Sequence, residues 1–99
     1  MVSPFDKSRK HPPRVVTVLG HKIKIRVIKN LIDDGDDLLG AFNSENMTIF
    51  LLKRPNWHHV LFHELLHASI YLSGAGEGMS INKEESIVLA LEHAIFPLI

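Results

Sequence analysis

The residues best suited to chemistry are two histidines and a glutamate in one short stretch, His63, Glu64 and His67. In an α-helix, residues four positions apart lie about 40° apart around the axis, so the side chains of His63 and His67 project from one face. Two imidazoles placed in this way can bind one metal ion. Glu64 lies about 100° from His63, close enough to that face to address a water molecule beside the metal. The spacing therefore predicts a metal centre on a helix.

Together these residues form the sequence HELLH, which matches the HExxH motif of zinc peptidases. Zinc lowers the pKa of water toward about 7 and polarises the carbonyl of the bond to be cleaved. Glu64 is then the general base, which accepts the water proton and passes it to the leaving amine. The motif predicts one zinc ion as the cofactor and peptide-bond hydrolysis as the reaction.

The segment around the motif has strong helical character. Apolar residues recur from Val60 to Leu72, and neither proline nor glycine interrupts the chain between Pro55 and Gly74. Asn56 after Pro55 is typical of a helix start, and Gly74 is typical of a helix end. We therefore expect one continuous helix that carries both histidines.

A catalytic zinc ion usually takes three protein ligands, so a third ligand must come from outside the motif. The longer pattern HExxHxxGxxH is absent, because Ile70 and Ser73 stand where glycine and histidine would be needed. The chain has no cysteine, which excludes a thiolate ligand. A glutamate from a following helix remains, either Glu84 or Glu85. We favour Glu84, which lies on the apolar side of that predicted helix, and retain Glu85 as the alternative.

Two further residues lie near the predicted metal face of the motif helix. His59 precedes His63 by one turn, and Tyr71 follows His67 by one turn. Helical position gives proximity but not orientation, so we expect packing or surface roles for both.

The residues before the motif helix predict a β-sheet. Period-two alternation and β-branched residues predict one hairpin from Arg14 to Ile28, with its turn at Gly20 and His21. A second hairpin is predicted from Leu38 to Leu52, and its last strand, Met47 to Leu52, leads into the motif helix. The sequence thus predicts an α+β fold with a three- or four-stranded antiparallel sheet.

The residues after the motif helix predict a glycine-containing loop and one more helix. Ser80 or Asn82 can cap this helix, which is expected to run from about Lys83 to Leu98. Because Glu84 and Glu85 stand in its first turn, this helix must pack against the motif helix if either one completes the metal site.

Length and composition indicate one domain. Residues 1–13 contain three prolines among polar residues and predict a flexible N-terminal arm, followed by a single domain over 14–99. Eleven basic residues balance eleven acidic residues, which favours neither nucleic acid nor an anionic membrane surface as a partner. With no cysteine, no secretory pattern and no apolar run near ~20 residues, we expect a cytoplasmic protein. The oligomeric state stays open.

The element order and the sequences HELLHA and EESIV, at 63–68 and 84–88, resemble minimal HExxH metallopeptidase-like proteins of phages and bacteria. These are distant relatives of the ImmA/IrrE group of gluzincins. The resemblance covers roughly Leu38 to Ile99. It implies a small zincin-like fold, one zinc ion bound by both motif histidines and a glutamate at 84 or 85, and Glu64 as the general base. It also implies a peptide or protein substrate that pairs with the strand before the helix, here Met47 to Leu52.

Two other functions remain open. The small size and short loops favour a zinc-stabilised binding module with little or no hydrolytic activity. Analogy with larger relatives suggests a regulator whose partner is a repressor or another DNA-associated protein. A purely structural site needs no general base, so the presence of Glu64 favours the peptidase.

Overall fold

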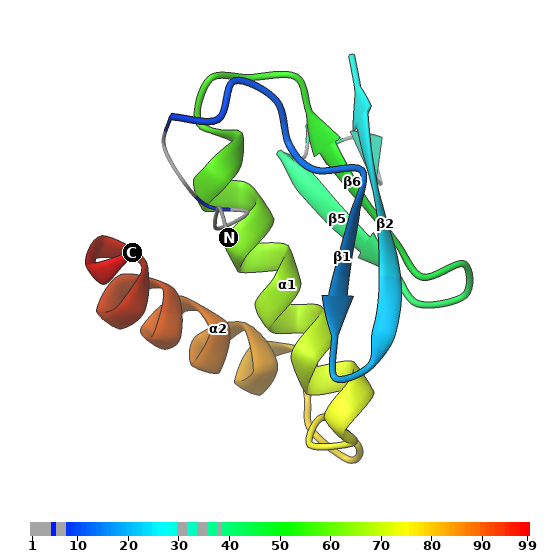
Figure 1. Cartoon of the computed structure of the whole chain (residues 1–99). Helices are drawn as coiled ribbons and strands as arrows, with labels where there is room; N and C mark the ends of the chain where they lie inside the picture. Colours follow the sequence, from blue (N-terminus) through cyan, green and yellow to red (C-terminus); the bar gives the residue numbers. More distant parts are fainter. Residues whose placement is uncertain (1–4, 6–7, 30–31, 34–35, 38) are drawn as a thin grey trace.

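The structure is a computed structural model, and its described residues are 5, 8–29, 32–33, 36–37 and 39–99. Within these residues it is a small α+β fold with a four-stranded mixed sheet and two α-helices (Figure 1). The elements in chain order are β1 (Val15–Val18), β2 (His21–Ile28), β3 (Ile32–Asp33), β4 (Asp36–Asp37), β5 (Gly40–Asn43), β6 (Thr48–Leu52), α1 (Trp57–Ser73), α2 (Ile81–Ile95) and the 3-10 helix η1 (Phe96–Leu98).

The strand order in the large sheet is β1-β2-β6-β5, and strands β3 and β4 pair separately. Strand β6 runs parallel to β2 and antiparallel to β5. The prediction of a purely antiparallel sheet is therefore wrong. The sequence pattern of a hairpin predicts which two strands pair within it. It does not predict which strands of two different hairpins lie side by side, or in which direction they run. Here the most buried strand, β6, lies inside the sheet, where both of its edges form hydrogen bonds.

Both predicted hairpins form. Strands β1 and β2 pair with Val18 opposite His21, and the two turn residues Leu19 and Gly20 have φ values of 48° and 81°. Two positive φ values in a two-residue turn are the geometry that matches strand twist. The turn lies one residue earlier than predicted. In the second hairpin, the Asn43 side chain accepts hydrogen bonds from the backbone of the β5–β6 turn; Leu38, its predicted start, lies outside the described residues.

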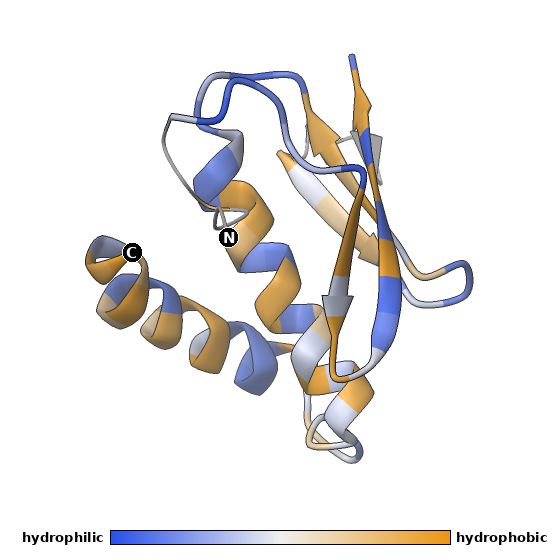
Figure 2. Ribbon diagram, in the orientation of Figure 1, coloured by the Kyte–Doolittle hydropathy of each residue, from blue (hydrophilic) through white to orange (hydrophobic). Residues whose placement is uncertain are grey.

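Helix α1 lies between the sheet and α2 (Figure 1). Apolar residues on one face of the sheet pack against apolar residues at helical spacing on α1, and Figure 2 shows orange, hydrophobic segments in both the strands and α1. The buried residues of this core are Ile23, Ile25, Ile49, Leu51, Trp57, Leu61, Leu65 and Ala68. Burial of this face fixes the rotation of α1, so its opposite face points toward α2.

Helix α2 begins at Ile81, two residues before the predicted start at about Lys83, and ends at Ile95, where the 3-10 helix η1 replaces the predicted last turn. The Ser80 hydroxyl accepts a hydrogen bond from the Lys83 backbone, which caps the helix. Its apolar side is less buried than its spacing suggests, because Val88 is buried but Leu91 and Ile95 are exposed. The other buried residue of α2 is Glu92. The helix is therefore rotated so that carboxylates, rather than its full apolar side, face α1.

The N-terminal segment contacts α1 through two of its described residues. The ring of Phe5 stacks on Phe62 with a centroid separation of 5.3 Å, and the His58 side chain bonds to the Arg9 carbonyl oxygen at 3.1 Å. The predicted flexible arm, residues 1–13, thus makes specific contacts with the domain. Among the helices of the described chain, none is long and apolar enough to cross a membrane.

Candidate metal centre

The face of α1 that points away from the sheet carries three histidines four residues apart, His59, His63 and His67. The facing surface of α2 carries three glutamates. Contacts run in opposite order along the two helices: His59 and His63 meet Glu92, whereas His67 meets Glu84. The two helices therefore bring imidazoles and carboxylates together in one row.

Glu85 lies between the two motif histidines. Its Oε1 is 3.1 Å from Nε2 of His63, and its Oε2 is 3.0 Å from Nε2 of His67. One potential ligand atom from each of these residues lies within 4.8 Å of the others. Ligand atoms about 2.0–2.1 Å from a tetrahedral zinc ion lie about 3.3 Å from one another. The three residues could therefore hold one metal ion.

Glu84, the favoured third ligand from the sequence, lies elsewhere. Its Oε2 is 2.6 Å from Nδ1 of His67, the ring nitrogen that does not face Glu85. The geometry therefore favours the alternative, Glu85, as the ligand. Glu84 instead orients the His67 ring by accepting its Nδ1 proton, as carboxylates commonly do behind a metal-binding histidine.

Glu92 orients the His63 ring in the same way that Glu84 orients the His67 ring. Its Oε2 is 2.7 Å from Nδ1 of His63, and its Oε1 pairs with His59. Sequence reasoning assigned no role to Glu92. A signal was present, since Glu85 and Glu92 are seven residues apart and therefore share one helix face. His59 stands four residues before His63 and therefore lies on the same face of α1 as the motif histidines. Its ring also stacks on Phe96, which agrees with the packing role expected for it.

Tyr71 lies outside this row. Its side chain is exposed and contacts the ring of Phe42 edge-on, with centroids 5.9 Å apart. That contact agrees with the packing or surface role expected for it.

Glu64 is buried between the histidine row and the sheet, with 8% of its surface exposed. Burial raises the pKa of its carboxyl, and the negative charges of Glu85 and Glu92 raise it further, while His63 and His67 lower it. A carboxylate with a raised pKa is a stronger proton acceptor. Its environment therefore suits a general base better than a surface glutamate would.

The pKa of His63 is also raised. Burial alone would lower it, but the hydrogen bond to Glu92 and the negative charges of Glu64, Glu92 and Glu85 outweigh burial. Four carboxylates thus surround three imidazoles in a partly buried cluster. A divalent cation would offset this excess of negative charge. Buried carboxylates are usually either paired with cations or bound to a metal ion.

Two hollows open beside Glu64, along strand β5. One has a volume of about 380 Å³ and is lined by Gly40 and His63, and the other, about 950 Å³, is lined by Phe42 and His67; Glu64 lines both. Strand β5 is an outer strand of the sheet. Among the described strands, an unpaired strand edge therefore runs past the candidate general base.

Removing the carboxylates behind the histidines is expected to weaken metal binding without abolishing it. Glu84→Gln and Glu92→Gln should each lower zinc affinity by about 10- to 100-fold, because the ring that each one orients becomes free to rotate. Competition with a chromophoric chelator measures the change. Glu45→Gln, an exposed glutamate in the β5–β6 turn, is the matched control. Equal affinities for all three variants and the unchanged protein would contradict this role.

Comparison of the chain with protein-family models, with curated proteins and with solved structures gives no match.

Proposed function

We propose that the protein is a zinc-dependent metallopeptidase with a small zincin-like fold. The observation that carries the proposal is the convergence of three potential ligands, His63, His67 and Glu85, beside the buried carboxyl of Glu64. A binding module stabilised by zinc would need the three ligands but no buried carboxylate next to them. The HELLH motif supports the same assignment.

The donor set suits zinc. Imidazole nitrogens with one carboxylate are a common catalytic set for this ion and leave a fourth position for water. When bound, zinc supplies Lewis acidity, which acidifies water and polarises the carbonyl of the bond to be cleaved.

The side chains of the protein perform the remaining steps. Glu64 accepts the proton of the attacking water and delivers it to the nitrogen of the leaving amine. Glu84 and Glu92 hold the two rings with their Nε2 atoms toward the metal position. Burial of Glu64 keeps bulk water away from its carboxylate and preserves its basicity.

The substrate strand proposed from the sequence requires a correction. Strand β6 is flanked by β2 and β5, so it has no free edge to which a peptide could add. The outer strand β5 has one. The Leu39 carbonyl accepts a hydrogen bond from the Leu52 N–H, so the backbone groups of Leu39 point toward β6. The N–H and C=O groups of successive strand residues point to opposite edges, so those of Gly40 and Phe42 point to the outer edge of β5. We therefore infer that an extended peptide pairs with β5 rather than with β6.

The proposal is tested by incubating the zinc-loaded protein with a mixture of unstructured peptides and detecting products by mass spectrometry. Cleavage that stops on addition of a chelator and returns with zinc is the expected result. Stoichiometric zinc binding without cleavage of any peptide would overturn the peptidase and favour the binding module.

Gly40 is expected to be essential for the contact between β5 and α1. A Cβ atom there would lie 2.6 Å from Cγ1 of Val60 and 3.3 Å from Cγ of Glu64, which is too close for the first contact. Gly40→Ala should therefore lower the free energy of unfolding by about 1–3 kcal/mol, the usual cost of overpacking. Urea denaturation measures it.

A double variant separates this clash from other effects. Val60→Ala removes the methyl group that the new Cβ would meet, so Gly40→Ala should cost less in that background than in the unchanged protein. An equal cost in both backgrounds would show that the contact with Val60 is not the cause.

A further inference from the structure

A third hollow, of about 1000 Å³, lies at the N-terminal end of α1. Its walls come from residues 8–14, from strand β2, and from the connection between β6 and α1, including the first turn of the helix. Figure 1 shows the N-terminal segment and that connection at the same end of the molecule. Among the described residues, none lines both this hollow and either hollow at the metal centre.

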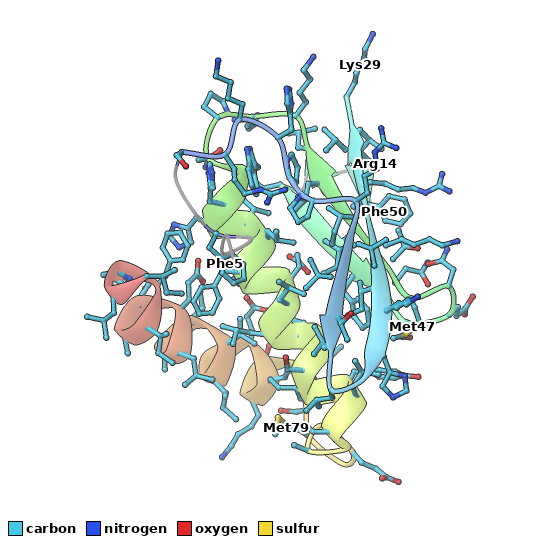
Figure 3. The ribbon with its side chains drawn as sticks, viewed as in Figure 1. Phe5, Arg14, Lys29, Met47, Phe50 and Met79 are labelled. Atoms are coloured by element: carbon cyan, nitrogen blue, oxygen red, sulfur yellow. The ribbon has the colours of Figure 1, made fainter. Side chains whose placement is uncertain are left out.

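Cationic side chains surround this hollow. They are Arg9, Lys10, Arg14, Lys53 and Arg54, and no acidic side chain of the described chain lines it. Among the side chains that the structure describes, the ion pairs lie between the histidines of α1 and the glutamates of α2 and include none of these cations. The chain as a whole has no net charge. The charged side chains among the described residues that line this hollow are therefore cationic; Figure 2 shows hydrophilic segments at this end, and Figure 3 labels Arg14.

Arg9 has an unmet hydrogen-bonding requirement at this site. Its Nε is buried and has no hydrogen-bond partner among the residues that the structure describes. Its carbonyl oxygen accepts a hydrogen bond from His58 at 3.1 Å, which fixes the residue against the start of α1. A buried guanidinium N–H without an acceptor is costly, and an anion in the hollow would supply one.

The N-terminus of helix α1 adds to the positive electrostatic potential at this hollow. Asn56 forms no side-chain cap, and the first turn contains no acidic residue. The free N–H groups of a helix N-terminus attract anions, and cations beside them strengthen the attraction. The hollow therefore combines three features that favour an anion: clustered cations, an unpaired Arg9 Nε and an uncapped helix end.

The same hollow also offers apolar contact. Ile25, Val27 and Leu52 line it together with Trp57 and three prolines. Val27 is 46% exposed, although it shares a strand face with buried Ile25. A ligand that fits must therefore have an apolar part as well as negative charge. The volume is at the upper end of the range for single small-molecule pockets, about 300–1,000 Å³.

We propose that this hollow binds a small organic polyanion of nucleotide size, with its phosphate groups on the arginines and its apolar part against the strand residues. Arginine suits phosphate because its planar fork can donate two parallel hydrogen bonds. A nucleic acid strand is less favoured. The exposed cations of β2 are Lys22, Lys24 and Arg26. They alternate with Ile23 and Ile25 and so point away from α1, and they do not form a continuous positive groove with the hollow.

The test uses adenosine 3′,5′-bisphosphate as the probe. Its two phosphates are attached to different carbons, so they do not readily chelate a zinc ion at the candidate metal centre. Trp57 is the only tryptophan and lines the hollow, so its fluorescence reports binding directly. The expected result is a saturable change with one probe per chain. Adenosine alone and inorganic phosphate alone should each bind at least tenfold more weakly, because each lacks one of the two features.

Matched variants locate the site. Arg9→Gln and Arg54→Gln should each weaken binding by about tenfold or more, the usual cost of losing a hydrogen bond to a charged group. Arg26→Gln removes the same charge from the exposed outer face of β2 and should leave affinity unchanged. Circular dichroism verifies that all three variants fold. Equal weakening by all three would overturn the proposal. So would the absence of probe binding by both fluorescence and calorimetry, or binding of a single-stranded oligonucleotide where the mononucleotide fails.

Discussion

Glu64→Gln is expected to abolish peptide hydrolysis while leaving zinc binding intact. Glutamine has nearly the same shape as glutamate but cannot accept the proton of the attacking water. Loss of a general base typically costs about 10²- to 10⁴-fold in rate. Because Glu64 is not one of the three convergent ligands, the affinity for zinc should change little. Steady-state cleavage of a fluorogenic peptide and a zinc titration on the same sample measure both quantities.

The stability of this variant is a useful companion measurement. The side chain of Glu64 is buried and its pKa is raised by that burial, so a neutral amide should be tolerated there. We expect the free energy of unfolding of the variant to equal or exceed that of the unchanged protein near neutral pH. Full activity in the Glu64→Gln variant would contradict the assigned role, and loss of zinc would indicate that Glu64 is itself a ligand.

Glu85→Gln is expected to have the largest effect on zinc affinity among the glutamates of α2. Its two oxygens face the Nε2 atoms of both motif histidines, so the substitution removes the charge of the proposed third ligand. We expect a loss of more than about 100-fold, against about 10- to 100-fold for Glu84→Gln, which acts through the His67 ring. Competition with a chelator of known affinity ranks the variants.

The ranking itself is the informative outcome. If Glu84→Gln weakens zinc binding more than Glu85→Gln does, then the ligand favoured by the sequence pattern is the correct one. The two helices would then have to rotate on metal binding, since Glu84 contacts Nδ1 of His67 and not the Nε2 face.

Local sequence signals predicted the elements of this fold well. Uninterrupted helix formers between Pro55 and Gly74 predicted α1, and Gly74 ends that helix with a left-handed backbone. Ser80, one of the two capping residues that the sequence offered, caps α2. These features depend on residues close in sequence, which is why composition and spacing were sufficient.

The arrangement of the elements depended on information that no local pattern contains. Glu84 and Glu85 differ by about 100° around their helix, so the choice between them follows from how α2 rotates against α1. That rotation buries Glu92 and leaves Leu91 partly exposed, contrary to a simple apolar-face rule. The strand order is a similar case. Alternation predicted both hairpins but not that β6 would lie between β2 and β5.

The most direct test of the metal centre is X-ray absorption spectroscopy on the protein after titration with zinc. We predict one zinc ion per chain, with two imidazole nitrogens and carboxylate oxygen in the first shell at about 2.0–2.2 Å. His63→Ala and His67→Ala should each remove one imidazole from that shell. Failure to bind a stoichiometric zinc ion, or a first shell that keeps both imidazoles in these variants, would contradict the assignment of His63, His67 and Glu85 as the metal site.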